Sequence, residues 1–476
     1  MKFVPLPHQP RMIDWMLSRP YSANWGSPGL GKSVVTLKVI EERILCGSPG
    51  ALLISPLRVS RITWKTQPTL WDHSSWLKVV NLNTEEGAKA WEDGSADIYL
   101  THYDMLATVE KKINCPRCKG KGCSECENGK VLRKYPGHAE KFLKRKTVPV
   151  DQIVWDEISI AKDPSSKRIN AVRAFNHHFK TRIGLTGTPS PNSYLDLFAQ
   201  IRLLDGGERL GISFHAYRNR YFETDYMGYR WTLRPGAKEQ IDAKLADIAL
   251  VVKGSDWLML PQTTTEEITV ELPPVAKSAY KELEKEFLLK LKNGEIVASS
   301  SAVLVNKLLQ ITGGAVYDLD RTVHTLHRAK LDALIALRKR MGTEPMLVMT
   351  AFQHEKARVI AEIPGAQEFR EADLPDWIAG KISVWVAGPG QITFGVDGLQ
   401  KSCRVVVWMT PTYSQEKYEQ TNARVIRTGQ TRETLVFRII AKGTIDDAVY
   451  EALRSKSDEQ SGLMNAVLAL QLLQEP

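Results

Sequence analysis

The chain has 476 residues, of which 43% are hydrophobic and 25% charged, a balance that indicates a folded protein of two or three domains rather than a disordered one. Its net charge of +10 and its pI near 9.1 favour an anionic partner. No apolar run reaches the ~18 residues that a membrane span needs, and the first residues, MKFVPLPHQPRM, lack the apolar core of a secretory signal, so we expect neither a membrane protein nor a secreted one.

Two series of short apolar, β-rich runs alternate with helical patterns along the chain, as βαβ units require. The first series consists of Ala51–Ser55, Ile98–Thr101, Gln152–Trp155 and Arg182–Leu185. The second consists of Met346–Thr350, Ser383–Ala387, Arg404–Trp408 and Leu435–Ile440. The predicted fold class is therefore α/β, with two regions that each contain a parallel sheet.

The same pattern sets the domain boundaries that we expect. Residues 1–205 form a first lobe with an insertion at about 110–147, and residues 325–455 form a second lobe. Between the lobes, residues 206–324 are polar and mostly helical, with one long amphipathic helix over KSAYKELEKEFLLKLKNGE. The tail, residues 456–476, is expected either to dock as a helix over Gly462–Leu473 or to contact a partner.

The first chemical motif is GSPGLGKS, which fits the G-x4-G-K-S pattern of a phosphate-binding loop. Its functional positions are Gly26, Gly29, Gly31, Lys32 and Ser33. The glycines let backbone N–H groups turn toward phosphate oxygens, the lysine supplies positive charge to the β- and γ-phosphates, and the serine hydroxyl ligates Mg²⁺. A helix expected from Val34 to about Leu45 points its positive end at the same phosphates. The alternative is a glycine-rich turn that fits the pattern by chance.

An apolar strand, Gln152–Trp155, leads directly into Asp156 and Glu157. Ligands bind at the carboxyl ends of the strands in a parallel sheet. There Asp156 would hold Mg²⁺, and Glu157 would act as the general base that polarises the attacking water. An isolated Asp-Glu pair is more often a solvated turn, but the phosphate loop upstream favours the catalytic interpretation.

Three polar residues near the end of the chain, Gln420, Arg424 and Arg427, are spaced by four and then three positions. This spacing predicts one face of a helix that ends at the Thr428-Gly429 turn. Such a face is ordinarily only solvated. In a nucleotide-driven motor, however, two arginines that reach the γ-phosphate from a second lobe would serve as arginine fingers.

Four of the six cysteines fall in CPRCKGKGCSEC, as two C-x2-C pairs formed by Cys115, Cys118, Cys123 and Cys126. In a chain without a secretory signal, this spacing predicts a tetrahedral zinc site with four thiolate ligands, and free or redox-active thiols are the alternative. The surrounding segment, Glu110 to Thr147, holds twelve Lys or Arg against four acids, a net +8. Four thiolates and one Zn²⁺ would reduce this charge to about +6.

We expect this insertion to follow the strand at Ile98–Thr101 and a helix at Met105–Lys111, and therefore to emerge at the sheet edge opposite the nucleotide. Its basic flank consists of Arg133, Lys134, Lys144, Arg145 and Lys146. These side chains would contact the phosphates of a nucleic acid. A solvated surface insertion and a protein docking site fit the same charge.

The chain resembles the Swi/Snf-type branch of the superfamily-two helicases, the ATP-dependent DNA translocases and remodellers. The resemblance rests on the Q-x3-R-x2-R-x-G-Q string at Gln420–Gln430 and on the segment VFRIIAKGTIDDAVYEAL that follows it. LPHQPRMIDWML is similar to the family's opening motif, GLTGTPSPN (Gly184–Asn192) to its third motif, and LPQTTTEEITVELPPVAKSAYKELE to the segment that links its lobes. The similarity runs from about Leu6 to Leu453 and is interrupted once, by the cysteine insertion.

This resemblance implies two RecA-like lobes, with ATP and Mg²⁺ in the cleft and nucleic acid across both lobes. It also implies that Gln9 reads the adenine edge, while Gln420 helps to position the nucleotide. Two motifs depart from the family. In DEISIAKD, Ser159 replaces the histidine that normally bridges to the third motif, so coupling of hydrolysis to movement is a weaker expectation than hydrolysis itself. The fifth motif, GPGQITFGVDGLQKS at Gly388–Ser402, is a loose match.

We therefore expect a monomeric motor, driven by ATP, that translocates on nucleic acid, most simply duplex DNA, in the cytoplasm of a bacterium or of a phage-infected host. Its cofactors would be ATP, Mg²⁺ and Zn²⁺. Two other functions remain open: a strand-separating helicase on RNA or single-stranded DNA, and a zinc-dependent adaptor that uses ATP only as a conformational switch. The complete catalytic set argues against the adaptor; it consists of Lys32, Asp156, Glu157, Arg424 and Arg427.

Overall fold

The computed structural model describes residues 1–119, 121–187, 189, 193–224, 231–257, 260–292, 298–393 and 396–454. The chain forms two compact units: Met1–Ser190 with Tyr194–Trp257, and Leu258–Pro476 with Pro191–Ser193. Residues 206–324, expected as one helical region, are thus divided between the two units. The helix proposed for Gly462–Leu473 lies outside the described residues.

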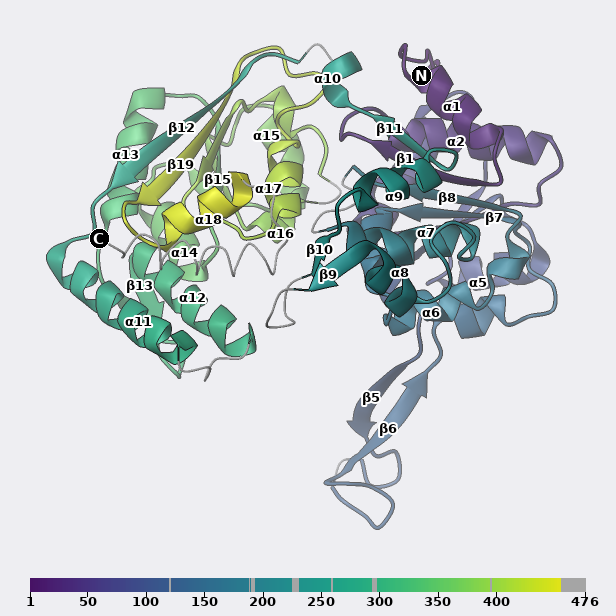
Figure 1. Ribbon diagram of the computed structural model, residues 1–476, viewed down its shortest axis with the longest axis horizontal. Coiled ribbons are helices and arrows are strands. Elements are labelled where there is room, and N and C mark those ends of the chain that lie inside the picture. The colour runs from purple at the N-terminus through teal and green to yellow at the C-terminus, as the bar shows by residue number, and fades with distance from the viewer. Residues whose placement is uncertain are drawn as a thin grey trace. The chain divides into compact units, whose positions relative to one another are not determined.

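The first unit contains a seven-stranded parallel sheet with the order β11-β1-β8-β7-β2-β4-β3 (Figure 1). Its strands are β1 (Tyr21–Gly26), β2 (Ala51–Ser55), β3 (Val79–Asn81), β4 (Ile98–His102), β7 (Gln152–Asp156), β8 (Thr181–Leu185) and β11 (Ala249–Val252). All four strands predicted for this lobe are confirmed. The strand β2 is buried at every position, as expected for a strand of a parallel sheet that helices cover on both faces.

Helices surround this sheet and connect its strands. They are α1 (Gln9–Leu17), α2 (Lys32–Leu45), α3 (Leu57–Arg61), α4 (Thr63–Leu70), α5 (Glu85–Asp93), α6 (Lys167–Arg173), α7 (Leu197–Asp205), α8 (Phe214–Tyr221), α9 (Ala237–Leu245) and α10 (Gly254–Trp257). A short antiparallel pair, β9 (Phe222–Thr224) with β10 (Trp231–Leu233), lies outside the main sheet. The helix predicted after the phosphate loop is confirmed as α2, whose apolar side chains Val35, Leu37 and Ile40 are fully buried.

A β-hairpin replaces the helix that we predicted at Met105–Lys111, so that prediction is wrong. Only a single 3-10 turn, η1 (Tyr103–Met105), follows β4. The chain then forms β5 (Val109–Asn114), which pairs antiparallel with β6 (Lys130–Tyr135) and projects from the body of the first unit (Figure 1). Val109, Lys111 and Ile113 lie on one face of β5 and Glu110 and Lys112 on the other, because alternate side chains of a strand point to opposite faces.

The second unit contains a six-stranded parallel sheet with the order β12-β19-β18-β15-β17-β16. Its strands are β12 (Thr263–Val270), β15 (Met346–Met349), β16 (Ala366–Glu368), β17 (Val384–Ala387), β18 (Val405–Trp408) and β19 (Thr434–Ala441). The four strands predicted for this lobe are confirmed. Two parallel sheets of this kind, each flanked by helices, confirm the predicted α/β class with two RecA-like lobes.

The helices of the second unit are α11 (Pro274–Lys292), α12 (Ala298–Thr312), α13 (Ala329–Met341), α14 (Gln353–Glu362), α15 (Leu374–Ile378), α16 (Pro389–Ile392), α17 (Gln415–Asn422) and α18 (Ile445–Arg454). A small antiparallel pair, β13 (Ala315–Tyr317) with β14 (Val323–Thr325), follows α12. The long helix predicted from the KSAYKELEK segment is confirmed as α11. Within the described residues, no helix combines the length and the apolar character needed to cross a membrane.

Candidate ATP site and metal centre

The phosphate-loop residues lie in one tight turn between β1, which ends at Gly26, and α2, which begins at Lys32. Gly29 and Gly31 have φ angles of 86° and 77°, which glycine adopts without steric cost. A Cβ on Gly31 would lie 2.4 Å from Nε2 of Gln9, so no larger residue fits there. The Lys32 ammonium donates to the carbonyl of Gly26 at 2.5 Å, and it therefore lies across the mouth of the turn.

Gln9 lies at the start of α1 and contacts the phosphate loop from outside. Its side chain is 4% exposed, its Nε2 donates to the carbonyl of Leu30 at 3.2 Å, and its Oε1 accepts from the backbone N–H of Leu6 at 3.0 Å. His8, which the sequence analysis did not identify, places Nε2 2.9 Å from the same Leu30 carbonyl. Two adjacent side chains of α1 and its cap thus bind one carbonyl of the loop.

The strand β7 ends in the predicted carboxylate pair. The indole N–H of Trp64 donates to Oδ2 of Asp156 at 2.7 Å, which fixes the orientation of that carboxyl group. Burial raises the pKa of Asp156 to about 6, although the Trp64 hydrogen bond and the positive charge of Lys32 oppose the rise. Lys32 of the phosphate loop and Asp156 are therefore close enough to interact electrostatically.

Glu157 is held by hydroxyl groups from two different segments. Its backbone has φ of 56°, in the left-handed region, which is uncommon for a residue with a side chain and recurs at functional sites. Its Oε1 accepts hydrogen bonds from Ser159 at 2.7 Å and from Thr186 at 2.6 Å. Ser159, at the position of the family's histidine, therefore contacts the carboxylate rather than the segment after β8.

The segment after β8 also touches the phosphate loop. The backbone N–H of Thr186 donates to the carbonyl of Asn24 in β1, and a Cβ on Gly187 would lie 3.1 Å from Cδ of Pro28. Thr186 thus joins Glu157 to β1, and the next residue, Gly187, packs against the phosphate loop. Thr188 and residues 190–192 of the same motif lie outside the described residues.

In the second unit, the three polar residues near the end of the chain do not share one helix, so that prediction is wrong. The helix α17 ends at Asn422, and Arg424 and Arg427 follow in tight turns. After Asn422 the backbone N–H groups of Arg424 and Val425 donate to carbonyls three residues back, as in a tight turn. Val425 is fully buried there, and the Asn422 side chain accepts a hydrogen bond from the indole of Trp408 at 3.1 Å. Packing of this segment against the sheet therefore replaces a further helical turn.

Both arginines are nevertheless brought together, because they approach the same carboxylate. Arg427 forms an ion pair with Oδ1 of Asp397, and Nη1 of Arg424 lies 3.7 Å from that oxygen. Arg424 also donates from Nε to the carbonyl of Thr393 at 3.1 Å. Gln420, 5% exposed, donates to Glu416 of its own helix at 3.2 Å. In the loosely matching fifth motif Asp397 lies near the family's usual asparagine, but the sequence gave no signal for its contacts with the two arginines.

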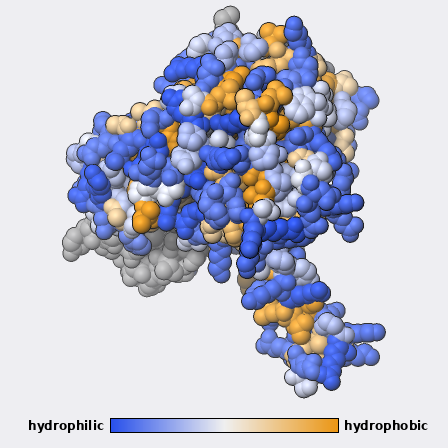
Figure 2. Space-filling view, turned by 90° about the vertical axis from the view of Figure 1, so that its right-hand side faces the viewer, coloured by the Kyte–Doolittle hydropathy of each residue, from blue (hydrophilic) through white to orange (hydrophobic). Residues whose placement is uncertain are grey.

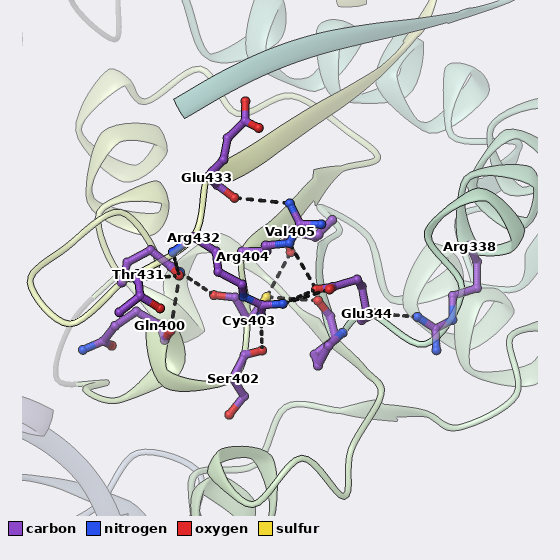
Figure 3. Close-up of polar contacts among 12 residues, drawn as sticks. Arg338, Glu344, Gln400, Ser402, Cys403, Arg404, Val405, Thr431, Arg432 and Glu433 are labelled. Carbon is purple, nitrogen blue, oxygen red and sulfur yellow. Dashed lines mark hydrogen bonds and ion pairs between the residues drawn. The ribbon is translucent and has the colours of Figure 1, made fainter. Parts of the chain in front are cut away.

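The loop after the arginines is fixed to the sheet by the Gln430 amide. It is also fixed by the ion pairs of Glu344 with Arg404 and Arg432, which Figure 3 shows. The Gln430 amide, 8% exposed, donates to the carbonyl of Cys403 at 2.9 Å, and its oxygen accepts from the backbone N–H groups of the next two residues. The Glu344 carboxylate forms ion pairs with Arg432 at 2.8 Å and with Arg404 at 3.3 Å. These contacts hold the segment that carries both arginines in one place relative to β18.

The four predicted cysteine ligands converge at the tip of the β5–β6 hairpin. Their sulfurs lie within 4.8 Å of one another, and the separations Cys115–Cys123, Cys118–Cys126 and Cys123–Cys126 are 3.8, 3.6 and 3.7 Å. Four thiolates bound tetrahedrally with Zn–S bonds of about 2.3 Å would stand about 3.8 Å apart. The donor set therefore fits one zinc ion, and none of these cysteines forms a disulfide.

The position expected for this insertion is wrong. We predicted that it would emerge opposite the nucleotide, but the hairpin begins directly after the carboxyl end of β4. There the Tyr103 hydroxyl donates to the backbone carbonyl of Asp156 at 3.1 Å, and the Thr101 hydroxyl lies 2.6 Å from Nδ1 of His138. The absence of the predicted helix explains the difference, because nothing carries the chain to the opposite edge first.

The SNF2-related domain matches residues 8–313, more than half of the chain. "Putative protein p41" of Acyrthosiphon pisum secondary endosymbiont phage 1 is 29% identical over 486 residues, which cover 98% of this chain and 99% of that protein. A SWI/SNF-related matrix-associated actin-dependent regulator of chromatin subfamily A-like protein 1 from Drosophila melanogaster is 22% identical over 67% of this chain; the match spans 42% of that longer protein.

One solved structure supports the fold, and a second is reported with it. The helicase domain of Hef from Pyrococcus furiosus matches with a TM-score of 0.53 and 14% identity, over 94% of this chain and 98% of that chain. The SWI2/SNF2 ATPase core of Sulfolobus solfataricus in complex with dsDNA matches with a TM-score of 0.44 and 20% identity, over 100% of this chain and 97% of that chain.

Proposed function

Because the chain belongs to the SNF2-related family of the superfamily-two helicases, we propose that it hydrolyses ATP to translocate on nucleic acid, with duplex DNA as its track. The observation that carries the proposal is the assembly around Glu157, where Thr186 joins the general base to β1, the strand that leads into the phosphate loop. A motor needs such a link between the nucleotide and the rest of the lobe. The basic balance of the chain fits a polyanionic track.

In this proposal the first unit supplies the chemistry of hydrolysis. Lys32 neutralises the β- and γ-phosphates, while Ser33 and Asp156 ligate the Mg²⁺ that accompanies ATP. Glu157 accepts a proton from the attacking water. Gln9 reads the adenine edge, and the turn formed by Gly26, Gly29 and Gly31 encloses the phosphates.

The second unit supplies positive charge in the transition state. Arg424 and Arg427 act as arginine fingers on the transferring γ-phosphate, and Gln420 positions the nucleotide without adding charge. Their present partner, Asp397, is about half exposed, so a phosphate oxygen competes with a solvated carboxylate for the two guanidinium groups. The zinc ion, held by the four cysteines, orders an insertion that has little apolar core of its own.

The test is the rate of ATP hydrolysis with duplex DNA, single-stranded DNA and RNA in parallel, together with displacement of a triplex-forming strand from duplex DNA. We expect duplex DNA to stimulate hydrolysis most strongly and the triplex to be displaced only with ATP. Stronger stimulation by RNA or single-stranded DNA, with strand separation, would replace this proposal by the strand-separating alternative. Slow turnover with tight nucleotide binding and no stimulation would indicate an adaptor.

A further inference from the structure

The β5–β6 hairpin has two faces of different chemistry, which its register defines. Residues directly opposite each other in an antiparallel pair lie on the same face. The pairs Val109–Tyr135, Lys111–Arg133 and Ile113–Val131 form one face, which we call the tyrosine face. The pairs Glu110–Lys134, Lys112–Leu132 and Asn114–Lys130 form the opposite face.

On the opposite face, acidic partners already neutralise much of the charge. Lys134 lies 3.3 Å from Glu110, directly across the pair, and Lys112 lies 3.1 Å from Glu127. Near the tip, Arg117 forms an ion pair with Glu125. At the base, Arg145 of the predicted basic flank lies 2.8 Å from Glu92. Lys134 and Arg145 are therefore weaker candidates for phosphate contacts than their place in the sequence suggested.

The tyrosine face keeps its cations available. Within the described part of the chain, no carboxylate forms an ion pair with Lys111 or Arg133, and both are exposed. Instead they border the Tyr135 ring, at 5.9 and 5.7 Å from its centroid. A guanidinium that covers a ring lies much closer, as Arg19 does over Trp15 at 3.6 Å. The Tyr135 ring therefore retains open surface, and the residue is 39% exposed.

Apolar side chains extend this surface along the same face. Val109, opposite Tyr135, is 45% exposed, and the Ile113–Val131 pair is partly exposed as well. Figure 2 shows hydrophobic side chains gathered on the hairpin between hydrophilic ones, below the body of the first unit. An exposed ring beside cations without acidic partners is the combination by which proteins bind unpaired nucleotides: bases stack on the ring while the cations contact phosphates.

We propose that the tyrosine face of the zinc hairpin binds unpaired nucleotides, with a base stacked on Tyr135 and phosphates held by Lys111 and Arg133. Duplex DNA is the weaker ligand of this face, because its bases present no open ring surface for Tyr135 to stack on. The inference deepens the proposed interaction with nucleic acid, but it concerns binding and does not require ATP hydrolysis.

The architecture suits this role, since the hairpin is fixed at both ends. At its tip, four thiolates converge where one zinc ion fits. At its base, the backbone N–H of Ala139 donates to the carbonyl of Leu106 at 3.2 Å, and His138 contacts Thr101 of β4. A rigid ladder between two fixed ends presents the ring and both cations with little loss of conformational entropy on binding.

The experiment uses the full chain, zinc-loaded, and a fluorescein-labelled 20-nucleotide oligodeoxythymidine, with a 20-base-pair duplex as the second ligand. Binding is followed by fluorescence anisotropy at several salt concentrations. We expect Tyr135→Ala to weaken binding of the single strand about tenfold without changing its salt dependence, and Tyr135→Trp to retain it. Lys111→Ala with Arg133→Ala should weaken binding and lower the salt slope by about two.

The opposite face provides matched controls on the same hairpin. Leu132→Ala and Lys134→Ala remove an exposed apolar and an exposed basic side chain, and both should bind the single strand as the unaltered protein does. Zinc content confirms that each variant keeps its hairpin. In addition, an oligonucleotide containing 5-iododeoxyuridine should photocross-link to Tyr135, as located by mass spectrometry.

Two results would overturn the inference. One is unaltered single-strand binding by Tyr135→Ala together with a cross-link elsewhere; the other is an equal loss of binding in the Leu132→Ala control. Failure of the proposed motor function is separate, because it would appear as an ATPase rate that no nucleic acid stimulates, whatever the hairpin binds.

Discussion

The hydroxyl of Thr186 lies 2.6 Å from Oε1 of Glu157 and joins the segment after β8 to the proposed general base at the end of β7. Ser159 donates to the same oxygen. Among the described residues no hydrogen-bond donor engages the other carboxylate oxygen, Oε2, so that oxygen is available to a water molecule. The two hydroxyl groups therefore orient the base while leaving it able to take a proton.

Replacing this base should separate ATP binding from hydrolysis. In Glu157→Gln the amide cannot accept the proton, so we expect turnover to fall by about 10²- to 10⁴-fold while ATP binding is retained. Lys32→Ala should lose both, because it removes the charge that binds phosphates. Steady-state hydrolysis and equilibrium binding of a fluorescent ATP analogue distinguish the two variants. Wild-type turnover in Glu157→Gln would refute the assigned role.

Thr186→Val should lower turnover by about 10² while ATP affinity changes little, because the carboxylate loses a hydroxyl that orients it. Ser159→Ala removes the second donor to the same oxygen and is the matched variant. Only Thr186→Val removes the side-chain link between Glu157 and the segment after β8, since Ser159 lies on the same segment as Glu157, so only the Thr186 variant should reduce the response of hydrolysis to nucleic acid. An equal loss in both variants would show that the two hydroxyls act only as supports for Glu157.

Arg424→Ala and Arg427→Ala should each leave ATP affinity within about tenfold and reduce turnover by about 10³, as loss of an arginine finger does. The control is Arg340→Ala on α13, an exposed arginine of the second unit whose guanidinium contacts Glu266 rather than Asp397. Single-turnover hydrolysis measures the chemical step directly. Normal turnover in either finger variant would identify that arginine as a structural partner of Asp397.

Binding of Mg²⁺ with ATP should weaken at acidic pH. The pKa of Asp156 is raised to about 6, chiefly by burial, so the carboxyl is protonated in the free protein below that pH. Metal binding requires the carboxylate, and we expect the affinity for Mg²⁺·ATP to fall about tenfold per pH unit below 6. Because the pKa of Asp156 is higher in the folded protein than in the unfolded chain, ionisation of this carboxyl lowers the free energy of unfolding of the free protein as the pH rises from about 4 to 6. In Asp156→Asn, the affinity for Mg²⁺·ATP should be lower and should not show this fall below pH 6, as measured by the same titration.

One zinc ion per chain is expected after native purification, measured by elemental analysis. Cys118→Ser should lose the metal, because three thiolates bind zinc less tightly than four, and it should expose the tip of the hairpin to proteolysis. Substitution of Cys46, which is exposed and far from the cluster in the sequence, is the control and should keep the zinc. A zinc content well below one equivalent in the unaltered protein would contradict the metal assignment.

The strands that run through buried, β-branched segments could be predicted in both sheets. Apolar runs of that length, in a βαβ pattern, rarely form anything but buried strands. Short or polar strands were not predicted. Examples are β1, which reads YSANWG, and β12, which reads TTTEEITV and is polar at most positions. Their place in the sheet comes from partners distant in the chain. The phosphate loop, the carboxylate pair and the cysteine cluster were predictable because each depends on local spacing.

Features that depend on packing were not predictable in the same way. The spacing of Arg424 and Arg427 suited a helix, but α17 ends before either arginine and gives way to tight turns in which Val425 is buried. Their shared contact with Asp397 joins segments that only the fold brings together. For the insertion, charge counting gave a uniform basic flank, whereas the register of the hairpin divides it into one face with ion pairs and one without.

The pairing of β12 with β19 has a consequence for how the protein is made. The strand that opens the second unit lies beside one of its last strands, in register from Thr263–Thr434 to Val270–Ala441. A ribosome must therefore synthesise almost the entire unit before its sheet can close, while the first unit can complete its own sheet once β11 has emerged. A chain that stops before Thr434 loses an interior strand and leaves the edges of β12 and β18 unpaired. Such edges recruit other chains, so truncation there should yield aggregates instead of a shorter motor.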